Sequence, residues 1–177
     1  MKLSSQPRGL DIAESNGMVV VACISELVVL ANHQISQSVK IAYEATCVSI
    51  SGEYVAVGGN DSKWRVYSAG TMQELAVIRE RDFVTSVRFS HDGRFLAVAD
   101  NAKNVKCYRV NGEVVKEPKF SDVTRDMWQH CAGKITNLSW SPDNRHLAAS
   151  SVDTQCFVYT PESVSSYIQI KSKFGYI

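Results

Sequence analysis

The stretch WSPDNRHLAASSVDTQCFVY, which runs from Trp140 to Tyr159, decides the fold. It begins with an aromatic residue and a Ser-Pro-Asp-Asn turn, continues through small apolar residues and an aspartate, and closes on an alternating strand. A single stretch of this kind predicts a β-hairpin, because alternating apolar residues between turn residues are typical of strands. If the stretch recurs along the chain, it predicts a repeat architecture instead.

The same parts do recur, in the same order. They are found in VSISGEYVAVGGNDSKWRVY (Val48–Tyr67) and in VRFSHDGRFLAVADNAKNVKCY (Val87–Tyr108). A fainter version, LDIAESNGMVVVACISELVVL, covers residues 10–30. The distance from the central alanine to the closing tyrosine is 11 positions in each of the three clear units. The units are spaced by 41 and 51 positions, and the extra ten fall in FSDVTRDMWQHCAGK (residues 120–134), where an insertion belongs in a loop.

Composition and charge narrow the function classes. The chain has 177 residues, of which 45% are hydrophobic and 21% charged, with a formal net charge of +1. Such a small charge favours neither nucleic acid nor an anionic membrane as partner. The most apolar run, residues 18–30, is 13 residues long and interrupted by Ser25 and Glu26, which is too short to span a bilayer. The five cysteines form no CxxC pair, and no signal peptide is visible, so we expect a reduced, cytoplasmic compartment.

Repeats of about 41 residues with about four strands each are typical of propeller blades. The pattern resembles the WD-repeat family, whose turns SPDN (residues 141–144) and SHDG (residues 90–93) match here. Asp61 and Asp153 each precede the closing aromatic by six positions, as the aspartate of that family does, whereas Ala102 occupies this position in the third unit. The family's closing tryptophan is replaced by tyrosine, at Tyr67, Tyr108 and Tyr159. We therefore predict an all-β WD-repeat β-propeller with about four blades.

The resemblance also implies roles for the repeat residues. His130 matches a loop histidine that bonds the blade aspartate, here Asp153. Asp61, the three closing tyrosines and this pair are accordingly expected to be structural. The dipeptides Asn16-Gly17, Asp92-Gly93 and Asp143-Asn144 are expected to supply the positive-φ residues that hairpins need. The small residues at positions 56, 97, 148 and 149 are expected in inner strands that crowd around a central channel.

The predicted blades fall within residues 1–160, and their bounds are residues 3–31, 41–70, 79–111 and 131–160. Residues 161–177 form a tail, SSYIQIKSKFGYI in its last part, which either pairs as an outer strand of the last blade or extends without a partner. Because four blades leave open sheet edges and apolar faces, we expect an incomplete ring and a chain that is a fragment of a larger propeller.

The units most resemble one branch of the WD-repeat family, in which two seven-bladed propellers promote disassembly of cofilin-decorated actin filaments. The most specific stretches are VAVGGNDSKWRVYS (residues 55–68) and VTSVRFSHDGRFLAVAD (residues 84–100), together with ITNLSWSPDNRHLAASSVD (residues 135–153). The resemblance implies actin filaments and ADF/cofilin as partners and the actin cytoskeleton as location. The alternative is a generic WD-repeat scaffold for another complex.

Two charged loops precede corresponding strands, RERD (residues 79–82) and DVTRDMW (residues 122–128). They should emerge on one rim of the propeller, where loops bind partners. The candidate protein-binding residues are Arg81, Asp82, Arg125, Asp126 and Trp128. The alternative is a solvated loop whose tryptophan packs back on the blade.

The sequence gives little support for an enzyme or for a cofactor-binding protein. There is no GxSxG elbow and no phosphate-binding glycine loop, and His130 with Cys131 lacks two further zinc ligands at suitable spacing. The histidines His91 and His146 lie in or beside turns and are expected to be solvated. We therefore predict a protein that is not an enzyme, with no cofactor, no metal and no small-molecule substrate.

Overall fold

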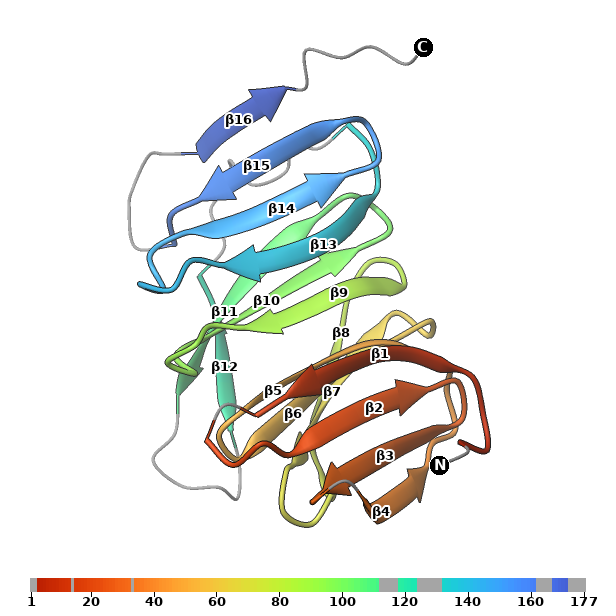
Figure 1. The fold of residues 1–177 in the computed structure, drawn as a ribbon. Helices are drawn as coiled ribbons and strands as arrows, with labels where there is room; N and C mark the ends of the chain where they lie inside the picture. The colour runs from red at the N-terminus through yellow and green to blue at the C-terminus, as the bar shows by residue number, and fades with distance from the viewer. Residues whose placement is uncertain are drawn as a thin grey trace.

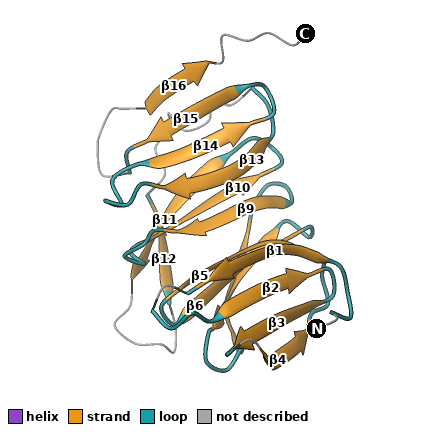
Figure 2. Cartoon of the chain, in the orientation of Figure 1, coloured by secondary structure: helices purple, strands orange, loops and turns teal. Residues whose placement is uncertain are grey.

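The computed structural model describes residues 3–13, 15–32, 34–111, 118–123, 132–161 and 167–171. In these ranges the chain forms four antiparallel sheets of four strands each, and no helix is described (Figures 1 and 2). Every sheet uses four strands that are consecutive in sequence and lie in that order from one edge to the other. We call these sheets blades 1 to 4.

The strand bounds follow the repeat. Blade 1 holds β1 (Pro7–Ile12), β2 (Val19–Cys23), β3 (Glu26–Ala31) and β4 (Gln34–Lys40). Blade 2 holds β5 (Ala45–Ser51), β6 (Tyr54–Gly59), β7 (Lys63–Ser68) and β8 (Glu74–Arg79). Blade 3 holds β9 (Val84–Phe89), β10 (Phe95–Asp100), β11 (Val105–Asn111) and β12 (Lys119–Asp122). Blade 4 holds β13 (Ile135–Trp140), β14 (Leu147–Ser151), β15 (Gln155–Tyr159) and β16 (Tyr167–Lys171).

The turns form where the sequence predicts them. Gly17 and Gly93 both have φ of 69°, and Asn144 has φ of 59°, so the three predicted positive-φ positions are confirmed. Glycine and asparagine tolerate this backbone region better than other residues do. The apolar run at residues 18–30 is the β2–β3 hairpin rather than one long segment. No helix in the described part of the chain is both long enough and apolar enough to cross a membrane.

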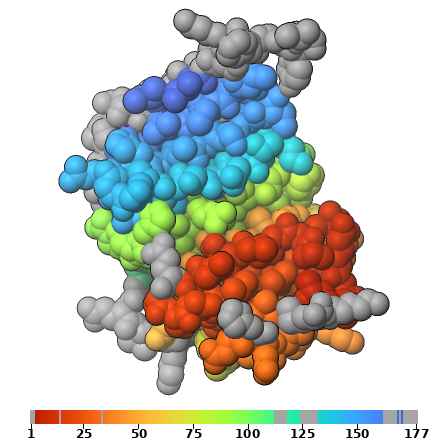
Figure 3. All heavy atoms as spheres, viewed as in Figure 1, coloured from red at the N-terminus to blue at the C-terminus, as the bar shows by residue number. Residues whose placement is uncertain are grey.

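The blades stack side by side through their first strands. β1 lies against β5, β5 against β9, and β9 against β13, and the remaining strands of every blade extend outward from there (Figure 1). In the space-filling view the red and orange blade 1 and the blue blade 4 lie at opposite ends of this row (Figure 3). The architecture is a propeller of four blades whose ring is not closed, which confirms the predicted fold class.

Of the four apolar core clusters in the described residues, three are each shared by two neighbouring blades, and the fourth lies within blade 1. Val20, Ala22 and Leu27 of blade 1 pack with Val48 and Ile50 of blade 2. The blade 2–blade 3 cluster includes Ala56, Val66, Val87 and Phe89. The blade 3–blade 4 cluster includes Ala97, Cys107, Leu138 and Trp140. Burying such side chains contributes about 1.5–3 kcal/mol each, so the contact between blades is the main apolar stabilisation.

The predicted position of the small residues is corrected by the structure. Ala56 lies in β6, Ala97 in β10, and Ala148 with Ala149 in β14, one strand outward from the first strands through which the blades stack. Ala56 and Ala97 are buried against the large residues of the following blade. Their small size therefore accommodates the neighbouring blade rather than crowding at the axis.

Each sheet also has a fourth strand that the predicted bounds leave out, β4, β8, β12 and β16, except that Arg79 of β8 falls at the first position of the third predicted blade. β16 comes from the predicted tail and pairs antiparallel with β15, so that Ile168 faces Val158 and Ile170 faces Cys156. Of the two interpretations of the tail, the structure shows the outer strand of blade 4.

Candidate interaction surface

The propeller has two rims, which differ in the direction of the first strands. We call the rim at which β5, β9 and β13 begin the start rim, and the rim at which β1, β5 and β9 end the end rim. Because the strands alternate in direction, the described loops between blades and the turns between second and third strands lie on the start rim. The predicted partner loop at residues 79–82 and the turn aspartates therefore share one rim.

The loop before β9 carries the first predicted pair. Arg81 is exposed. The Asp82 carboxylate is engaged inside the loop: it accepts bonds from the Phe83 N–H (2.7 Å) and the Asn101 side-chain amide (3.0 Å). The Asn101 amide, followed by the Phe83 N–H, lowers the pKa of Asp82. Arg81 is thus free to meet a partner while Asp82 fixes the loop that presents it. Arg125, Asp126 and Trp128 lie outside the described residues.

A hollow of about 310 Å³ opens on the start rim beside this loop. The threonines Thr46, Thr85 and Thr136 line it, one from the beginning of each of three first strands. Thr46 donates its hydroxyl to the Val84 carbonyl at 2.6 Å, a bond that crosses from blade 2 to blade 3. The wall of the hollow is therefore tied together and does not depend on a partner for its shape.

The charge at this hollow is predominantly basic. Arg8 and Lys134 line it and are exposed, and Glu44 is the acidic residue among its lining. The Lys134 ammonium lies 5.2 Å from the centre of the Phe83 ring, within the range of a cation–π contact. Together with Arg81, these side chains present positive charge to an approaching partner.

The turn aspartates differ between blades. The Asp61 carboxylate pairs with the Arg65 guanidinium through two bonds, at 2.6 and 3.1 Å. This bond holds the pKa of Asp61 below its ordinary value. In blade 3, where Ala102 replaces the aspartate, the buried Asp100 accepts bonds from the Asn104 backbone N–H and side-chain amide. Asp100 is thus a turn residue that the repeat comparison missed, because it lies two positions earlier.

Asp153 presents a different situation. Its Oδ1 accepts the Gln155 N–H at 3.2 Å, whereas its Oδ2 is buried and has no hydrogen-bond partner among the described residues. His130, the histidine predicted to bond this aspartate, lies outside the described residues. The carboxylate therefore retains an acceptor position for a donor, and the pairing of His130 with Asp153 stays a prediction.

The closing tyrosines are all buried. The Tyr67 hydroxyl lies 2.9 Å from the Tyr43 hydroxyl, and Tyr159 stacks on Phe157. The Tyr108 hydroxyl donates to the buried Glu80 carboxylate at 2.7 Å. Glu80 also accepts the Trp64 indole N–H at 2.9 Å and pairs with the Lys106 ammonium at 2.6 Å. This cluster fastens blade 2 to blade 3.

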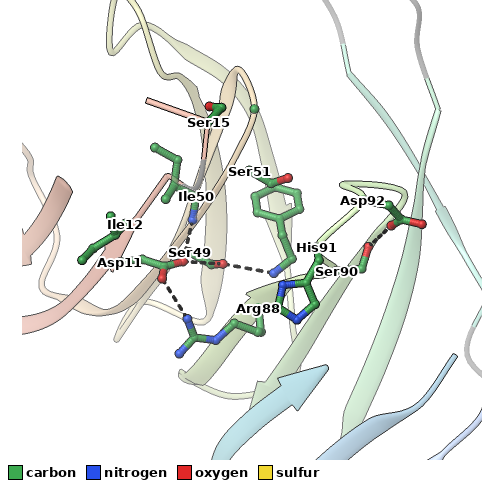
Figure 4. Close-up of a pocket in the computed structure, with 12 residues that line it drawn as sticks. Asp11, Ile12, Ser15, Ser49, Ile50, Ser51, Arg88, Ser90, His91 and Asp92 are labelled. Carbon is green, nitrogen blue, oxygen red and sulfur yellow. Dashed lines mark hydrogen bonds and ion pairs between the residues drawn. The ribbon is translucent and has the colours of Figure 1, made fainter. Parts of the chain in front are cut away.

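The end rim contains a larger hollow, of about 520 Å³, at the ends of β1, β5 and β9 (Figure 4). Asp11 lies at its centre. One carboxylate oxygen accepts the Ser49 hydroxyl at 3.0 Å and the Ile50 N–H at 2.9 Å, and the other pairs with the Arg88 guanidinium at 3.1 Å. Asp11, Ser49 and Arg88 belong to three consecutive blades, so the network locks the first strands together.

Sequence comparison had marked none of the members of this network. Asp11, Ser49 and Arg88 occupy the same position in their first strands, one before the last apolar residue of the strand. A search of equivalent positions for opposite charges would have found Asp11 and Arg88. The turn histidines His91 and His146 are exposed on this rim, and the His91 N–H bonds the Asn144 side chain at 2.7 Å.

The described residues give little scope for metal or thiol chemistry. In the described ranges, no three His, Cys, Asp or Glu side chains gather in a metal-binding arrangement. Cys23, Cys47 and Cys156 are free thiols, and Cys107 is buried. Burial raises the pKa of Cys47 to about 11 and also raises that of Cys107, which keeps these thiols protonated at neutral pH.

Comparisons with known proteins agree with the prediction of WD repeats. The family model described as WD domain, G-beta repeat matches residues 72–109 and 123–160. The chain is 34% identical over 170 residues to actin-interacting protein 1 of Caenorhabditis elegans, covering 94% of this chain and 27% of that protein. It is 35% identical over 177 residues to WD repeat-containing protein 1 of Bos taurus, covering 97% of this chain and 28% of that protein.

The chain therefore spans little more than a quarter of the length of these relatives. Among solved structures, the computationally designed Ika4 protein is similar, with a TM-score of 0.69 at 18% identity. That match covers 90% of this chain and 93% of the designed chain, and at this identity it bears on the fold alone.

Proposed function

We propose that this chain, which carries WD repeats and resembles part of actin-interacting protein 1, is a protein-interaction scaffold that acts with cofilin on actin filaments. The observation that carries the proposal is the match along 94% of the chain to a relative named for its interaction with actin. The proposed location is the cytoplasm, at the actin cytoskeleton.

The start rim is the proposed binding surface. Its basic side chains Arg8, Arg81 and Lys134 are exposed around a hollow whose wall is held by bonds between blades. Positive charge on a rigid rim suits an acidic protein surface, because it speeds encounter and fixes orientation. Arg125, Asp126 and Trp128 precede the corresponding strand of the next blade, and we propose that they extend this surface.

Binding rather than catalysis is the activity that this surface supports. Asp82, Asp61 and Asp100 are each engaged in a loop or turn bond. Carboxylates whose lone pairs are occupied in this way are poorly placed to act as general bases. The rim therefore presents hydrogen-bond donors to a partner, namely guanidinium, ammonium and hydroxyl groups.

The test is cosedimentation of the chain with actin filaments, with and without cofilin. We expect the chain to pellet with cofilin-decorated filaments more than with bare filaments. Arg81→Glu should reduce the bound fraction several-fold, because it reverses a charge at the centre of the proposed surface. Arg145→Glu is the matched control: it makes the same charge change on an exposed arginine of the end rim.

If both variants pellet to the same extent, the start rim is not the binding surface. No pelleting of the unmodified chain above its level without filaments would contradict the actin assignment. Enrichment of a different complex in a pull-down, without actin or cofilin, would then favour the generic scaffold.

A further inference from the structure

A groove lies on the outer side of the row of blades, between blade 1 and blade 2. Its volume is about 500 Å³. One wall comes from β4 and the loop that follows it, with Val39, Ile41 and Tyr43, and the other comes from β7 and β8, with Val77 among its residues. Both walls belong to this chain, so the groove is formed whether or not other blades lie beside these four. We call it the blade 1–2 groove.

The walls of the blade 1–2 groove are held in place by bonds within the chain. The Arg65 guanidinium bonds both carboxylate oxygens of Asp61, and its Cζ atom lies 3.7 Å from the centre of the Tyr43 ring. Towards the end rim, the Gln37 side-chain amide donates to the Thr71 carbonyl at 3.0 Å, which joins β4 of blade 1 to the turn before β8. The groove therefore has its shape before any partner arrives, which lowers the cost of binding.

The junction between blades 2 and 3 shows which side chain fills the corresponding place there. Trp64 of β7 packs edge-on against Phe120 of β12, with ring centroids 5.0 Å apart. In blade 1 the residue at the same point of the strand register is Leu27. Leucine is smaller than tryptophan, and Val39, its neighbour on β4, lines the groove. The blade 1–2 groove therefore suits a large aromatic side chain.

The charge differs between the two ends of the blade 1–2 groove. Lys40 ends β4 and Lys63 begins β7, so both lysines lie at the start-rim end. No ion pair in the described part of the chain uses either of them. At the other end the Glu74 carboxylate lies 3.5 Å from Arg65 Nε and is thereby paired. The start-rim end therefore attracts a carboxylate, and it does so next to the apolar walls.

We propose that the blade 1–2 groove binds an extended segment of a partner protein in which a large aromatic residue is flanked by acidic residues. The aromatic ring packs between Val39 and Val77, and a neighbouring carboxylate pairs with Lys40 and Lys63. The Val77 side chain, which is 46% exposed in the chain alone, is covered in this complex. The groove is separate from the start-rim hollow, so the proposal does not rest on the assignment to actin and cofilin.

The experiment is a titration of labelled peptides with the purified 177-residue chain, followed by fluorescence anisotropy. The probe is the peptide Gly-Glu-Glu-Trp-Glu-Gly with a dye at its N-terminus. Two matched peptides carry alanine in place of tryptophan, or glutamine in place of all three glutamates. We expect a Kd on the order of 100 μM for the probe, and binding weaker by about 10-fold for each matched peptide.

Variants of the chain locate the site. Val77→Glu places a carboxylate on the apolar wall and Lys40→Glu reverses a charge at the start-rim end, so each should weaken binding of the probe by about 10-fold. The matched controls are Val152→Glu and Lys119→Glu, which make the same changes on an exposed valine of blade 4 and an exposed lysine of β12. Both controls should bind the probe as the unmodified chain does. If circular dichroism shows that Val77→Glu unfolds, Val77→Ser replaces it.

Three results would overturn the proposal. The first is an unchanged anisotropy of the probe up to a chain concentration of about 1 mM. The second is equal binding of the probe and the two matched peptides, because neither the ring nor the charge would then be recognised. The third is equal weakening by the groove variants and by their controls, because the peptide would then bind elsewhere on the chain.

Discussion

The bond between the Tyr108 hydroxyl and the Glu80 carboxylate gives the most direct measure of how the closing tyrosines hold the blades. Tyr108→Phe removes one hydroxyl and keeps the buried ring, which packs on Trp64 with centroids 5.0 Å apart. The acceptor is charged and buried, and the bond is 2.7 Å long. Tyr67→Phe is the matched control, because the Tyr67 hydroxyl has the same position in its repeat but lies 2.9 Å from the Tyr43 hydroxyl and reaches a carboxylate, that of the exposed Glu74, only at 3.5 Å.

The two substitutions should differ in the free energy of unfolding. A hydrogen bond to a charged group contributes about 1.5–3 kcal/mol, and a neutral one about 1 kcal/mol. Tyr108→Phe should therefore lower the free energy of unfolding by about 2 kcal/mol, which corresponds to a Tm lower by roughly 4–8 °C. Tyr67→Phe should cost about half of that or less.

The assay is urea unfolding followed by tryptophan fluorescence and circular dichroism, with Glu80→Gln and the Tyr108→Phe/Glu80→Gln double variant completing a cycle. The expected coupling between the two side chains is about 1 kcal/mol or more. A cost for Tyr67→Phe equal to that of Tyr108→Phe, or a coupling indistinguishable from zero, would refute the assignment of the effect to this bond.

Three further predictions concern packing, acid stability and thiol reactivity. Gly58→Ala should lower the free energy of unfolding by about 1–3 kcal/mol, because the added Cβ meets Val84 of the next blade. Gly70→Ala is the control: its Cβ would have no atom within 4 Å, so the same urea titration should show no change or a slight stabilisation. Because the pKa of Asp61 is lowered in the folded chain, its ion pair stabilises the fold above the unfolded pKa near 3.9, and this stabilisation is lost as the pH falls through the folded pKa. Asp61→Asn should therefore make the free energy of unfolding fall less steeply from about pH 5 downward. The same steepness in variant and unmodified chain would contradict this. The buried Cys107 should react with a maleimide at pH 7.5 far more slowly in the folded chain than in urea. Mass spectrometry of the labelled peptide gives both rates, and equal rates would show that the thiol is accessible in the folded chain.

The architecture could be predicted because its determinants are local. Alternating apolar residues set the strands, and turn residues such as Asn144 and Gly93 set the hairpins with positive φ. The repeat then implied blades, since each unit has one apolar face on either side that only a neighbour can bury. The role of the small residues was placed one strand too far inward, because strand order within a blade is a tertiary property that the repeat does not encode.

The polar networks were much harder to predict. Asp11 bonds Ser49 and Arg88 across three blades, and the chain separation of Asp11 and Arg88 is far beyond any local pattern. Glu80 lies in the charged run at residues 79–82, where the sequence suggests a solvated loop, yet its side chain is buried between two blades. Polar residues that join repeats are visible in sequence only when equivalent positions are compared with the blade stacking already known.

We propose that this chain is a scaffold that acts with cofilin on actin filaments. The most direct measurement is the decay of fluorescently labelled filaments after dilution, with cofilin alone, with the chain alone, and with both together. We expect faster loss of filaments with both proteins than with cofilin alone, no effect of the chain alone, and a smaller effect of the Arg81→Glu variant. An unchanged decay when the chain is added to cofilin-decorated filaments, at concentrations that saturate any binding, would contradict it.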